Sequence, residues 1–493
     1  MAQNFKKDRD GIRLSSNRKE TSMERQQPRA QRKSAKTLGF SALFSISVGV
    51  IVGQTGAVSM LQALGIAGAG FFIAYAFAFL LAVCNALTFA ELALTLPGAG
   101  SISTYAEVTL GHFAAIIAVF LGYVVPVIFG AAAELMLFDS VIGQLFPDVL
   151  PHMAWALMLL GMLVLLNLAG TDVFATTQQV LTFVIIAFLL AVGLSATAET
   201  QAVGAAATPV WSGYLSGTAI VPVLVLCFWT LVGCEYVTPM VTEARAPTRD
   251  LPRAMVAGLA VVFAINMLFA FGTAHILSRA AVGASVTPHL DVVSAVFGHA
   301  GRIVFAVIAL TASASLINAV LGAVPRMLHG MALNGQVFPI FTRVSARRQV
   351  PVAALLFVGA CPVAGLVWAR GDPNNVLALS IAATICWMLV YLLAHVILLV
   401  LRSRRPQLER PFRTPLYPLP QLAGILGILF VILNSSPSPA MMPTIALYAG
   451  SVIVTFGAIA AVWVRFVMKK DLFTLIPSAS EPPESDVVAS SRK

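Results

Sequence analysis

The chain has 493 residues, of which 58% are apolar and only 11% are charged. Soluble proteins average about half apolar and about a quarter charged, so this composition excludes an ordinary soluble protein and indicates a membrane protein. Its apolar stretches are roughly 20 residues long, which suits membrane-spanning helices and not the shorter alternating strands of an outer-membrane barrel. A helical bundle is therefore expected.

The first 38 residues form a basic segment without aromatic side chains except Phe5. Eleven of the 31 Lys and Arg lie between Lys6 and Lys36. A basic segment before an apolar stretch predicts a disordered cytoplasmic tail over residues 1–38 and no nucleic-acid partner. Because it has no apolar core with a cleavage site, we expect the first helix to stay in the membrane. A second disordered cytoplasmic tail is expected over residues 469–493.

The five cysteines all lie in apolar stretches, and their number is odd. We therefore expect them to pack as small apolar side chains, without a disulfide framework. Cysteines and histidines are spread over separate predicted helices without the spacing of a metal site or a nucleophile. No metal, cofactor or catalytic residue is predicted, and the protein is not expected to be an enzyme.

Twelve membrane-spanning helices are predicted along the chain. They are expected over residues 40–62, 70–93, 112–145, 151–170, 175–197, 217–241, 254–278, 303–329, 350–369, 375–401, 420–434 and 443–467. With a cytoplasmic N-terminus, Lys and Arg divide 28 to 3 between inner and outer segments. Positive charge retained on the inner side sets orientation. We therefore expect a multi-pass protein of the cytoplasmic (inner) membrane with both termini in the cytoplasm.

Two of these helices are interrupted at matching positions. The first breaks within "GVIVGQTG" (residues 49–56), and the sixth breaks at Gly233, with Glu235 and Pro239 following. When the first ten helices are divided into two groups of five, residues 39–197 and 217–401, the breaks fall at corresponding places. This pattern predicts an inverted-repeat transporter with its binding site at mid-membrane and with residues 420–467 peripheral.

An unwound membrane segment exposes backbone groups that need a polar ligand or a water-filled cavity. After Gly53, the amides of Gln54, Thr55 and Gly56 lie at the positive end of a half-helix, which suits a carboxylate. Ile51 precedes them in the same break. These five residues are predicted to contact the substrate.

The carbonyls before the second break, near Trp229 and Val232, suit an ammonium group. Together with the first set they fit a zwitterionic α-amino acid, and Gly233 joins the predicted substrate site. Trp229 lies one turn before Gly233, where it can cover a bound ligand or stack on a cation. The alternative is a tryptophan that packs against lipid or in the core, since Trp concentrates at membrane interfaces.

Five stretches in the same order make the chain similar to a known family. They are the glycine cluster of the first helix, "LTFAELALTLPGAGSISTY", "FWTLVGCEYVTPMVTEARAPTRDLPRAM", "VPRMLHGMALNGQVFPIFTRV" and "RPFRTPLYPLP". From about Gly39 to Arg465 the chain resembles the amino acid/polyamine/organocation (APC) superfamily of permeases.

The resemblance implies an all-α, LeuT-type fold: a five-plus-five inverted repeat whose helices 1 and 6 are discontinuous. It also implies a substrate carboxylate on the helix 1 amides, a substrate amine on the helix 6 carbonyls, and Trp229 as the gating aromatic. One departure is the triplet Gly-Ser/Thr-Gly, which reads Gly53-Gln54-Thr55-Gly56 here.

A second departure concerns ion coupling. The helix 5 lysine that some members use for proton coupling corresponds most nearly to Ile185. Sodium in such folds binds helix 1 carbonyls and helix 8 hydroxyls, which Thr311, Ser313 and Ser315 could supply. Such hydroxyls more often serve helix–helix contacts.

Ionisable side chains inside predicted spans mark function by default, and Glu235 and Glu134 are the best candidates. Glu235 is predicted to titrate, coupling transport to protons or gating the inner pathway; the alternative is a carboxyl that caps unwound backbone. Glu134 is predicted to meet a cationic group of the substrate, or else to form a structural hydrogen bond to a neighbouring helix. Glu243 is expected to form cytoplasmic ion pairs with the arginines that follow it. Helix–helix hydrogen bonds are expected from Asn85, Asn266, Asn318, His275 and His395.

The predicted function is secondary active transport of amino acids by alternating access, as proton-coupled uptake or exchange. The expected partners are a small-molecule substrate, a proton or a sodium ion, and the lipid bilayer, and the protein is expected to be a monomer or a homodimer. The alternatives are a transporter or antiporter of polyamines or other organic amines, and, more remotely, a membrane enzyme or a transporter-like nutrient sensor.

Overall fold

The computed structural model describes residues 37–198, 217–369, 374–434 and 441–473. These residues form helices throughout and contain no strand apart from an isolated bridge between Leu38 and Ala244. The all-helical class is therefore confirmed for this part of the chain. Most of the two predicted tails lies outside it.

Eight helical stretches in the described residues are long and apolar enough to cross a membrane. They are Gly70–Thr95, His112–Leu145, Thr171–Ala198, Gly217–Met240, Pro247–Ile276, Gly301–Leu333, Ala378–Arg404 and Met442–Val467. The helices α2 (Phe40–Gly49) and α3 (Gln54–Ala67) are bent by 57° and make a ninth span if counted together. The chain is a multi-pass membrane protein, whereas twelve spans and two related halves stay predictions.

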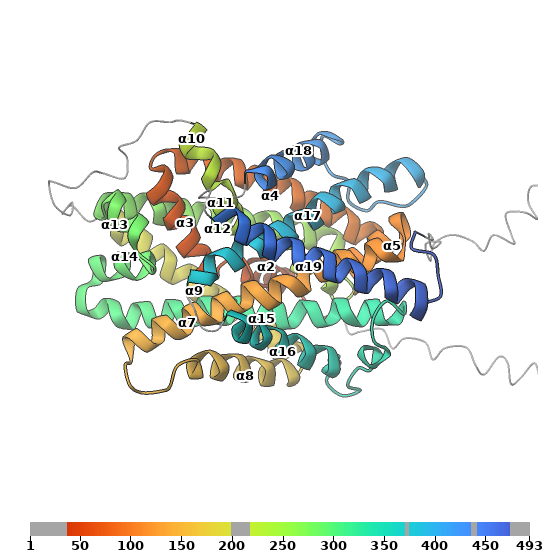
Figure 1. Ribbon diagram of the computed structural model, residues 1–493, viewed down its shortest axis with the longest axis horizontal. Coiled ribbons are helices and arrows are strands. Elements are labelled where there is room, and N and C mark those ends of the chain that lie inside the picture. Colours follow the sequence, from red (N-terminus) through yellow and green to blue (C-terminus); the bar gives the residue numbers. More distant parts are fainter. Residues whose placement is uncertain (1–36, 199–216, 370–373, 435–440, 474–493) are drawn as a thin grey trace, which may run out of the picture. The chain divides into compact units, whose positions relative to one another are not determined.

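The remaining elements are labelled as in Figure 1. They are α4 (Gly70–Thr95), α5 (Ile102–Leu110), α6 (His112–Val119), η1 (Phe120–Val124), η2 (Val127–Ala131), α7 (Ala132–Leu145), α8 (Ala154–Leu168), α9 (Thr171–Ala198), α10 (Gly217–Ile220), η3 (Val221–Val223), α11 (Leu224–Trp229), η4 (Cys234–Met240), α12 (Pro247–Ile276), α13 (Arg279–Ala284), α14 (Pro288–Phe297), η5 (Gly298–Ala300), α15 (Gly301–Leu333), η6 (Pro339–Thr342), α16 (Val352–Ala369), α17 (Asn374–Arg404), α18 (Leu419–Leu433), α19 (Met442–Val462) and η8 (Trp463–Val467).

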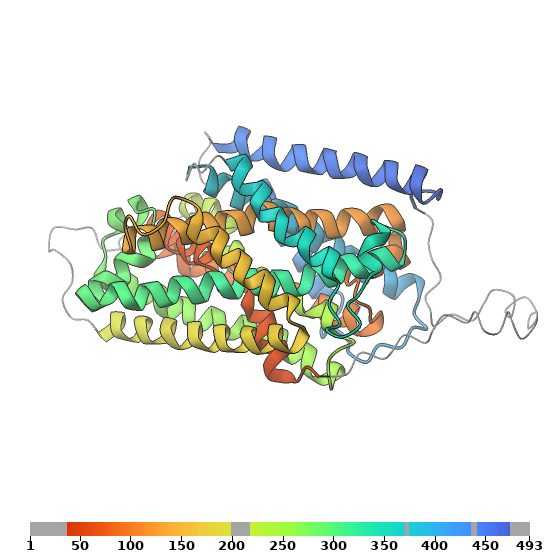
Figure 2. The same ribbon diagram turned by 90° about the horizontal axis from the view of Figure 1, so that it is seen from below.

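The long helix α15 is at the centre of the bundle. It packs against α7, α8, α9, α14 and α16, and Figure 1 shows α8 and α16 alongside it. The broken pair begins with α2, which packs against α9 and α12. Figure 2 shows α19 on the outer edge, where it contacts α17 and α6. Its side chains Leu447 and Val454 are 67% and 71% exposed, as expected for apolar groups that face lipid.

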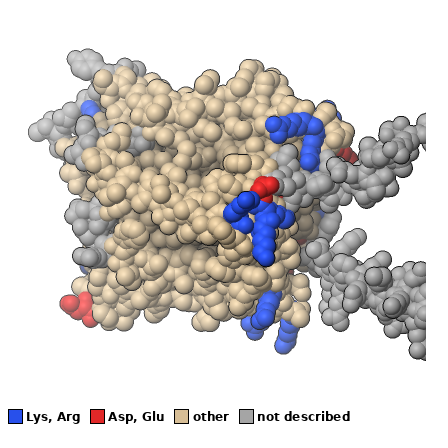
Figure 3. Space-filling view, turned by 45° about the vertical axis from the view of Figure 1, so that its right-hand side comes forward, with Lys and Arg blue, Asp and Glu red and all other residues tan. Residues whose placement is uncertain are grey.

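Charged side chains are distributed unevenly over the surface. Figure 3 shows a broad area without Lys, Arg, Asp or Glu, while Lys and Arg gather toward one end of the visible face. Many large exposed side chains on the helices are apolar, among them Leu165, Ile303 and Leu426. A charge-free belt of this kind suits contact with a bilayer.

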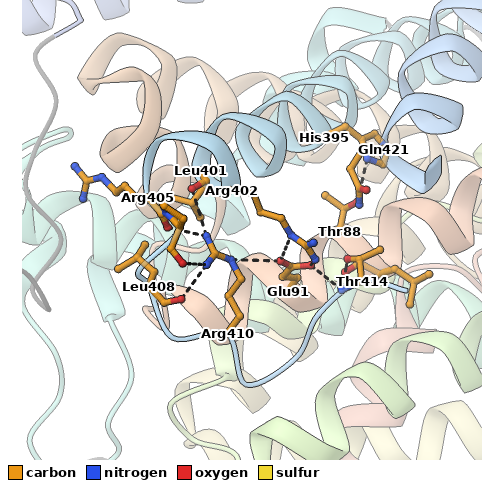
Figure 4. A network of polar contacts seen from close by, with 12 residues as sticks. Thr88, Glu91, His395, Leu401, Arg402, Arg405, Leu408, Arg410, Thr414 and Gln421 are labelled. Atoms are coloured by element: carbon orange, nitrogen blue, oxygen red, sulfur yellow. Dashed lines mark hydrogen bonds and ion pairs between the residues drawn. The ribbon is translucent and has the colours of Figure 1, made fainter. Parts of the chain in front are cut away.

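Glu91 connects α4 to the segment between α17 and α18 (Figure 4). Its carboxylate, which is fully buried, accepts two hydrogen bonds of 2.7 Å from the Arg402 guanidinium and one from the Thr414 amide. Arg410 lies 3.7 Å from the same carboxylate and donates to backbone carbonyls around Arg405. Burial lowers the pKa of Arg410 from its usual value. The stretch "RPFRTP" thus ties the end of α17 to α4.

The last described residues fold back onto the segment between α5 and α6. The amide of Phe113 donates to the carbonyl of Leu472, and Phe473 packs on the ring of Phe113. His112, which is fully buried, lies 3.1 Å from the Glu107 carboxylate and 3.1 Å from the Lys470 ammonium. Residues 470–473 therefore cover the start of α6.

Candidate functional site

The break in the first helix is held by a carboxylate from α7. Glu134 Oε1 accepts hydrogen bonds from the Gln54 amide at 2.8 Å and from the Ser313 hydroxyl at 2.6 Å. Its Oε2 accepts from the Thr55 amide at 2.9 Å and from the Thr55 hydroxyl at 2.8 Å. Both amides belong to the first turn of α3, where the helix dipole favours a negative charge. The contact is therefore electrostatically favourable as well as hydrogen-bonded.

Glu134 is fully buried, and in the described structure it forms no ion pair with a cationic side chain. The two amides that are predicted to bind a substrate carboxylate are thus occupied by a carboxylate of the protein itself. The structure contains the hydrogen bond to neighbouring helices that was one of the two predictions for Glu134. A contact with a cationic substrate stays a prediction.

Gln54, the residue that departs from the family triplet, points away from the sixth helix. Its Nε2 donates to the Ser313 hydroxyl at 2.7 Å, and its Oε1 lies 3.3 Å from His289 Nε2. His289 belongs to α14 and is 2% exposed. Together with Ile185, these two residues line a cavity of about 30 Å³ behind the first helix. Nothing in the sequence near His289 indicated this contact, because 235 residues separate the partners.

The break in the sixth helix falls where it was predicted. α11 ends at Trp229, and Gly233 has a φ of 117°, a conformation that favours glycine. Its amide donates to the Tyr391 hydroxyl at 3.1 Å, and this hydroxyl donates to Glu235 Oε2 at 2.5 Å. Trp387 Nε1 donates to Glu235 Oε1 at 2.9 Å. Glu235 is thus fixed to α17 by two aromatic side chains.

Tyr391 and Trp387 were not predicted as site residues. They are four residues apart on α17 and therefore lie on the same helix face. This spacing of two aromatic side chains with polar atoms, inside an apolar span, is the only signal that the sequence offers for them.

The two breaks meet at a central cavity of about 20 Å³. It is enclosed by both broken helices together with η2, α15 and α17. The predicted site residues on its wall are Ile51, Gly53, Thr55, Gly56, Trp229 and Val232. Gln54, Glu134, Gly233 and Glu235 are not on this wall, although each adjoins one of the two breaks. The structure therefore brings the two predicted half-sites together.

Trp229 covers one side of the central cavity. Its ring packs edge-on against Trp387, with centroids 6.1 Å apart and an interplanar angle of 80°. A Cβ atom added to Gly130 would lie 2.9 Å from the Trp229 ring. The absence of a side chain at Gly130 therefore makes room for this ring, and Tyr236 adds a further aromatic wall.

A larger cavity of about 420 Å³ lies next to the central one. Its lining comes mainly from α3, α7 and the segment before α8, and it includes Ser59, Gln62, Asp139 and His152. Thr55 lines both cavities. A single residue therefore borders the large cavity, the central cavity and the Glu134 carboxylate.

The hydroxyls predicted as sodium ligands do not converge on one point. Ser313 bonds Glu134, and the Thr311 hydroxyl donates to its own helix at Val307. The Ser315 hydroxyl donates to the Gly49 carbonyl at 3.3 Å and accepts from Gln178 Nε2 at 2.8 Å. Side-chain amides thus occupy the space between the first helix and α15.

Gln178 belongs to a chain of buried amides. Its Oε1 accepts from Asn318 Nδ2 at 2.8 Å, and Asn318 Oδ1 accepts from Asn167 Nδ2 at 2.8 Å. Gln178 Nε2 also lies 3.2 Å from the Thr182 hydroxyl. This chain connects α8, α15 and α9 with the broken first helix.

The helix–helix hydrogen bonds expected from weaker polar residues are present for Asn318, Asn266 and His395. Asn318 bonds two neighbouring helices, Asn266 donates to the Tyr75 hydroxyl, and His395 lies 3.0 Å from the Thr88 hydroxyl. His275 contacts the Phe271 carbonyl of its own helix. The Asn85 amide has no hydrogen-bond partner among the described residues, so that expectation was wrong.

Glu243 pairs with a different arginine from those expected. Its carboxylate accepts from Arg326 Nε at 2.8 Å, and not from the arginines that follow it in the sequence. Arg326 also donates to the Thr171 hydroxyl at 2.9 Å and lies over the Phe174 ring. The ion pair joins α15 to the segment after η4, and the Thr171 contact adds α9. A partly buried guanidinium needs such partners for its donors.

The fold and the site define a multi-pass membrane transporter, since two helices break at a shared central cavity. Residues 38–464 match a family model described as amino acid permease, and the chain belongs to this family. It is a member of the APC superfamily and a transporter, not an enzyme.

Two relatives illustrate the likeness. The chain is 26% identical over 416 residues to a putative histidine permease of Bacillus subtilis (strain 168), a match that covers 79% of this chain and 86% of the relative. It is 27% identical over 287 residues to a D-serine/D-alanine/glycine transporter of Escherichia coli (strain K12), covering 54% of this chain and 59% of the relative.

Proposed function

We propose that this protein is a secondary active transporter that moves amino acids across the cytoplasmic membrane by alternating access. One observation carries the proposal: both broken helices meet at a cavity beside two buried carboxyls, Glu134 and Glu235, that form no ion pair in the described structure. Charges inside a membrane are costly and mark substrate or ion pathways. The printed names of the relatives support amino acids as the substrate class.

In this proposal the substrate is held by both its charged ends. Its ammonium group binds carbonyls at the end of α11 near Val232, and its carboxylate binds amides at the start of α3. Trp229, on the wall of the central cavity, covers one side of the bound substrate. Opposed helix ends supply opposite partial charges, which is what a zwitterion needs.

The large cavity and the Arg326–Glu243 ion pair support a cycle of two states. A substrate enters from the outside through the large cavity and reaches Thr55 first. Opening to the cytoplasm requires that the Arg326–Glu243 pair separates and that Glu235 releases its contacts with α17. Glu235 acts as a gating contact in this scheme.

We propose the proton as the coupling ion. Between the first helix and α15, the amide of Gln178 already donates to Ser315 and lies 3.4 Å from the Ser45 carbonyl. A sodium ion would have to displace this amide. A proton needs only a buried carboxyl, of which the site has two.

An organic amine without a carboxylate is the second candidate substrate. The observation that favours this candidate is the position of Glu134, which already accepts the hydrogen bonds of the Gln54 and Thr55 amides. If Glu134 never leaves them, a substrate carboxylate has no place there.

Uptake into proteoliposomes tests the proposed function. The panel contains labelled L-histidine, D-serine, D-alanine and glycine with the corresponding amines, and proton and sodium gradients are imposed separately. We expect accumulation of at least one amino acid under an inward proton gradient. If no amino acid or amine moves under any gradient, the proposal is wrong.

Two tryptophan variants test the position of the site. Trp229→Ala removes the aromatic cover and is expected to raise the KM by about tenfold, as loss of a 1–2 kcal/mol contact predicts. Trp368→Ala is the matched control, because Trp368 is 58% exposed and is not on the cavity wall. Equal kinetics for the two variants would exclude Trp229 from the site.

A further inference from the structure

We propose that Glu134 competes with the carboxylate of the substrate for the α3 amides and takes up a proton when it is displaced. This inference rests on the proposed function, and it assigns proton coupling to Glu134, leaving Glu235 as a gating contact. Binding of one substrate molecule is then accompanied by uptake of one proton.

The competition follows from the hydrogen bonds of the empty site. The Gln54 and Thr55 amides each donate to one oxygen of Glu134, so neither amide is available to a second carboxylate. Two carboxylates at the same helix end would also repel each other. A substrate carboxylate can therefore bind these amides only after Glu134 has left them.

Protonation follows from the surroundings of Glu134 after displacement. It loses both amide donors, it is fully buried, and no cationic side chain replaces them, so only the neutral Thr55 and Ser313 hydroxyls are left to donate to it. A buried carboxylate whose charge is not compensated is far more costly than a neutral carboxyl group. The neutral form therefore becomes favoured as the substrate binds.

The proton balance of the cycle is simple. A hydronium ion of the large cavity gives up a proton, which forms an O–H bond on one Glu134 oxygen, and the substrate carboxylate accepts the two amide hydrogens. When the substrate leaves toward the cytoplasm, Glu134 releases this proton to water and returns to the amides. No covalent bond of the substrate changes.

Thr55 offers the route for this proton. Its side chain lines both cavities, and its hydroxyl donates to Glu134 Oε2 at 2.8 Å. Water in the large cavity is therefore one hydroxyl away from the carboxylate. Ser313 keeps the other oxygen in place, because its own hydroxyl accepts from Gln54 and so donates to Glu134.

The helices around Glu134 bring no competing titratable contact. Several elements pack on α7. Among them, the helices α3, α8 and η2 have no titratable side chain. The closest titratable group through hydrogen bonds is His289, which reaches Glu134 only through Gln54. None of the titratable side chains of α7, α15, α16 and α17 hydrogen-bonds to Glu134 in the described structure: Asp139, Arg302, Arg326, His329, Cys361, Cys386, Tyr391, His395, Arg402 and Arg404.

The test measures how substrate affinity depends on pH. The probe is whichever amino acid of the panel is accumulated, and its apparent Kd is measured between pH 5 and 8 in detergent. Because binding takes up a proton, affinity should rise as pH falls, by up to about tenfold per pH unit. The Glu134→Asp variant keeps a carboxylate and should keep this slope.

The Glu134→Gln variant separates coupling from a structural role. A neutral amide takes up no proton, so the apparent Kd should become independent of pH. Exchange of labelled for unlabelled amino acid should persist, while accumulation driven by a proton gradient should be lost. A merely structural Glu134 would instead leave the pH slope intact in whatever activity remains. The Glu235→Gln variant should also retain the slope.

Three results would overturn the inference without touching the proposed function. They are an amino acid affinity that does not change with pH, a slope that survives Glu134→Gln, and a slope that disappears in Glu235→Gln. A competition experiment supplies a fourth such result. Histamine is tested against labelled L-histidine, or ethanolamine against labelled D-serine. If the amine displaces the label as well as the unlabelled amino acid does, Glu134 keeps the amides permanently. Absence of all transport would instead refute the proposed function itself.

Discussion

At the residue scale, buried amide side chains hold the broken first helix in place. Gln54 follows the break and reaches Ser313, while Gln178 of α9 donates to Ser315 and lies 3.4 Å from the Ser45 carbonyl of α2. Neither contact could be predicted, because each joins residues more than 130 positions apart. The residues of the two breaks were predictable, since glycine and charged residues inside apolar spans stand out locally.

The contact between Gly49 and Gln178 allows a test of the amide chain. A Cβ atom at Gly49 would lie 2.1 Å from Gln178 Nε2, so Gly49→Ala must displace this amide. We expect a loss of about 1–3 kcal/mol of stability, which is typical for overpacking a dense core. Thermal unfolding in detergent measures it. Gly161→Ala is the control, because nothing lies within 4 Å of that position, and equal unfolding temperatures would contradict the prediction.

At the element scale, the positions of the long helices could be predicted well. Residues 70–93 and 112–145 were predicted as spans, and the structure has Gly70–Thr95 and His112–Leu145. The short helices α13 and α14 were not predicted as elements. A search for apolar stretches of about 20 residues cannot detect them, because they are short and partly polar. The contact from α14 to Gln54 was missed for this reason.

We expect the Arg326–Glu243 pair to keep one side of the bundle closed, namely the side opposite to the large cavity. Arg326→Gln leaves Glu243 without its cation, and breaking a partly buried pair costs about 3–5 kcal/mol. The population of the inward-open state should therefore rise. Its measure is the alkylation rate, from the cytoplasmic side, of a cysteine at Val320 on the central cavity, with the native cysteines replaced by alanine.

The control for this prediction is Arg347→Gln, because Arg347 is exposed and forms no ion pair in the described structure. A Val320 cysteine that reacts equally fast in both variants would show that the pair does not control closure.

The Glu91 contact between α4 and the segment before α18 is expected to be structural. Glu91→Gln leaves Arg402 and Arg410 beside each other without a negative charge. We expect destabilisation of about 3 kcal/mol or more, since both guanidinium groups are largely buried. Glu409→Gln serves as the control at an exposed position of the same segment. If both variants unfold at the same temperature, Glu91 has no such role.

At the scale of the whole molecule, the distribution of positive charge predicts how the chain is inserted. Lys and Arg divide 28 to 3 between the predicted inner and outer segments. Arg302 and Arg347 are exposed at predicted outer and inner positions. A cysteine at position 302 should react with an impermeant maleimide in intact cells, and one at 347 only after permeabilisation. The opposite pattern would reverse the orientation.

The number of spans and the relation between the two halves could be proposed from the sequence but not established. α8, α16 and α18 are shorter apolar helices of 15, 18 and 15 residues. Helices of this length lie near the lower limit for crossing a bilayer, so composition alone does not decide whether each one spans. The corresponding breaks in the first and sixth helices remain the strongest sequence evidence for a repeat.

The contact between residues 470–473 and α6 sets a limit on truncation. The Lys470 ammonium lies 3.1 Å from His112, and the Leu472 carbonyl accepts a hydrogen bond from the Phe113 amide. Both contacts depend on residues after Met468. A Cβ atom on Gly111 would lie 2.7 Å from the Phe473 Cα, which shows how closely the two segments fit. A chain cut at Met468 would expose His112 and the Glu107 carboxylate to water. Phe473 is therefore the earliest C-terminal residue that preserves this joint, and an affinity tag belongs beyond it.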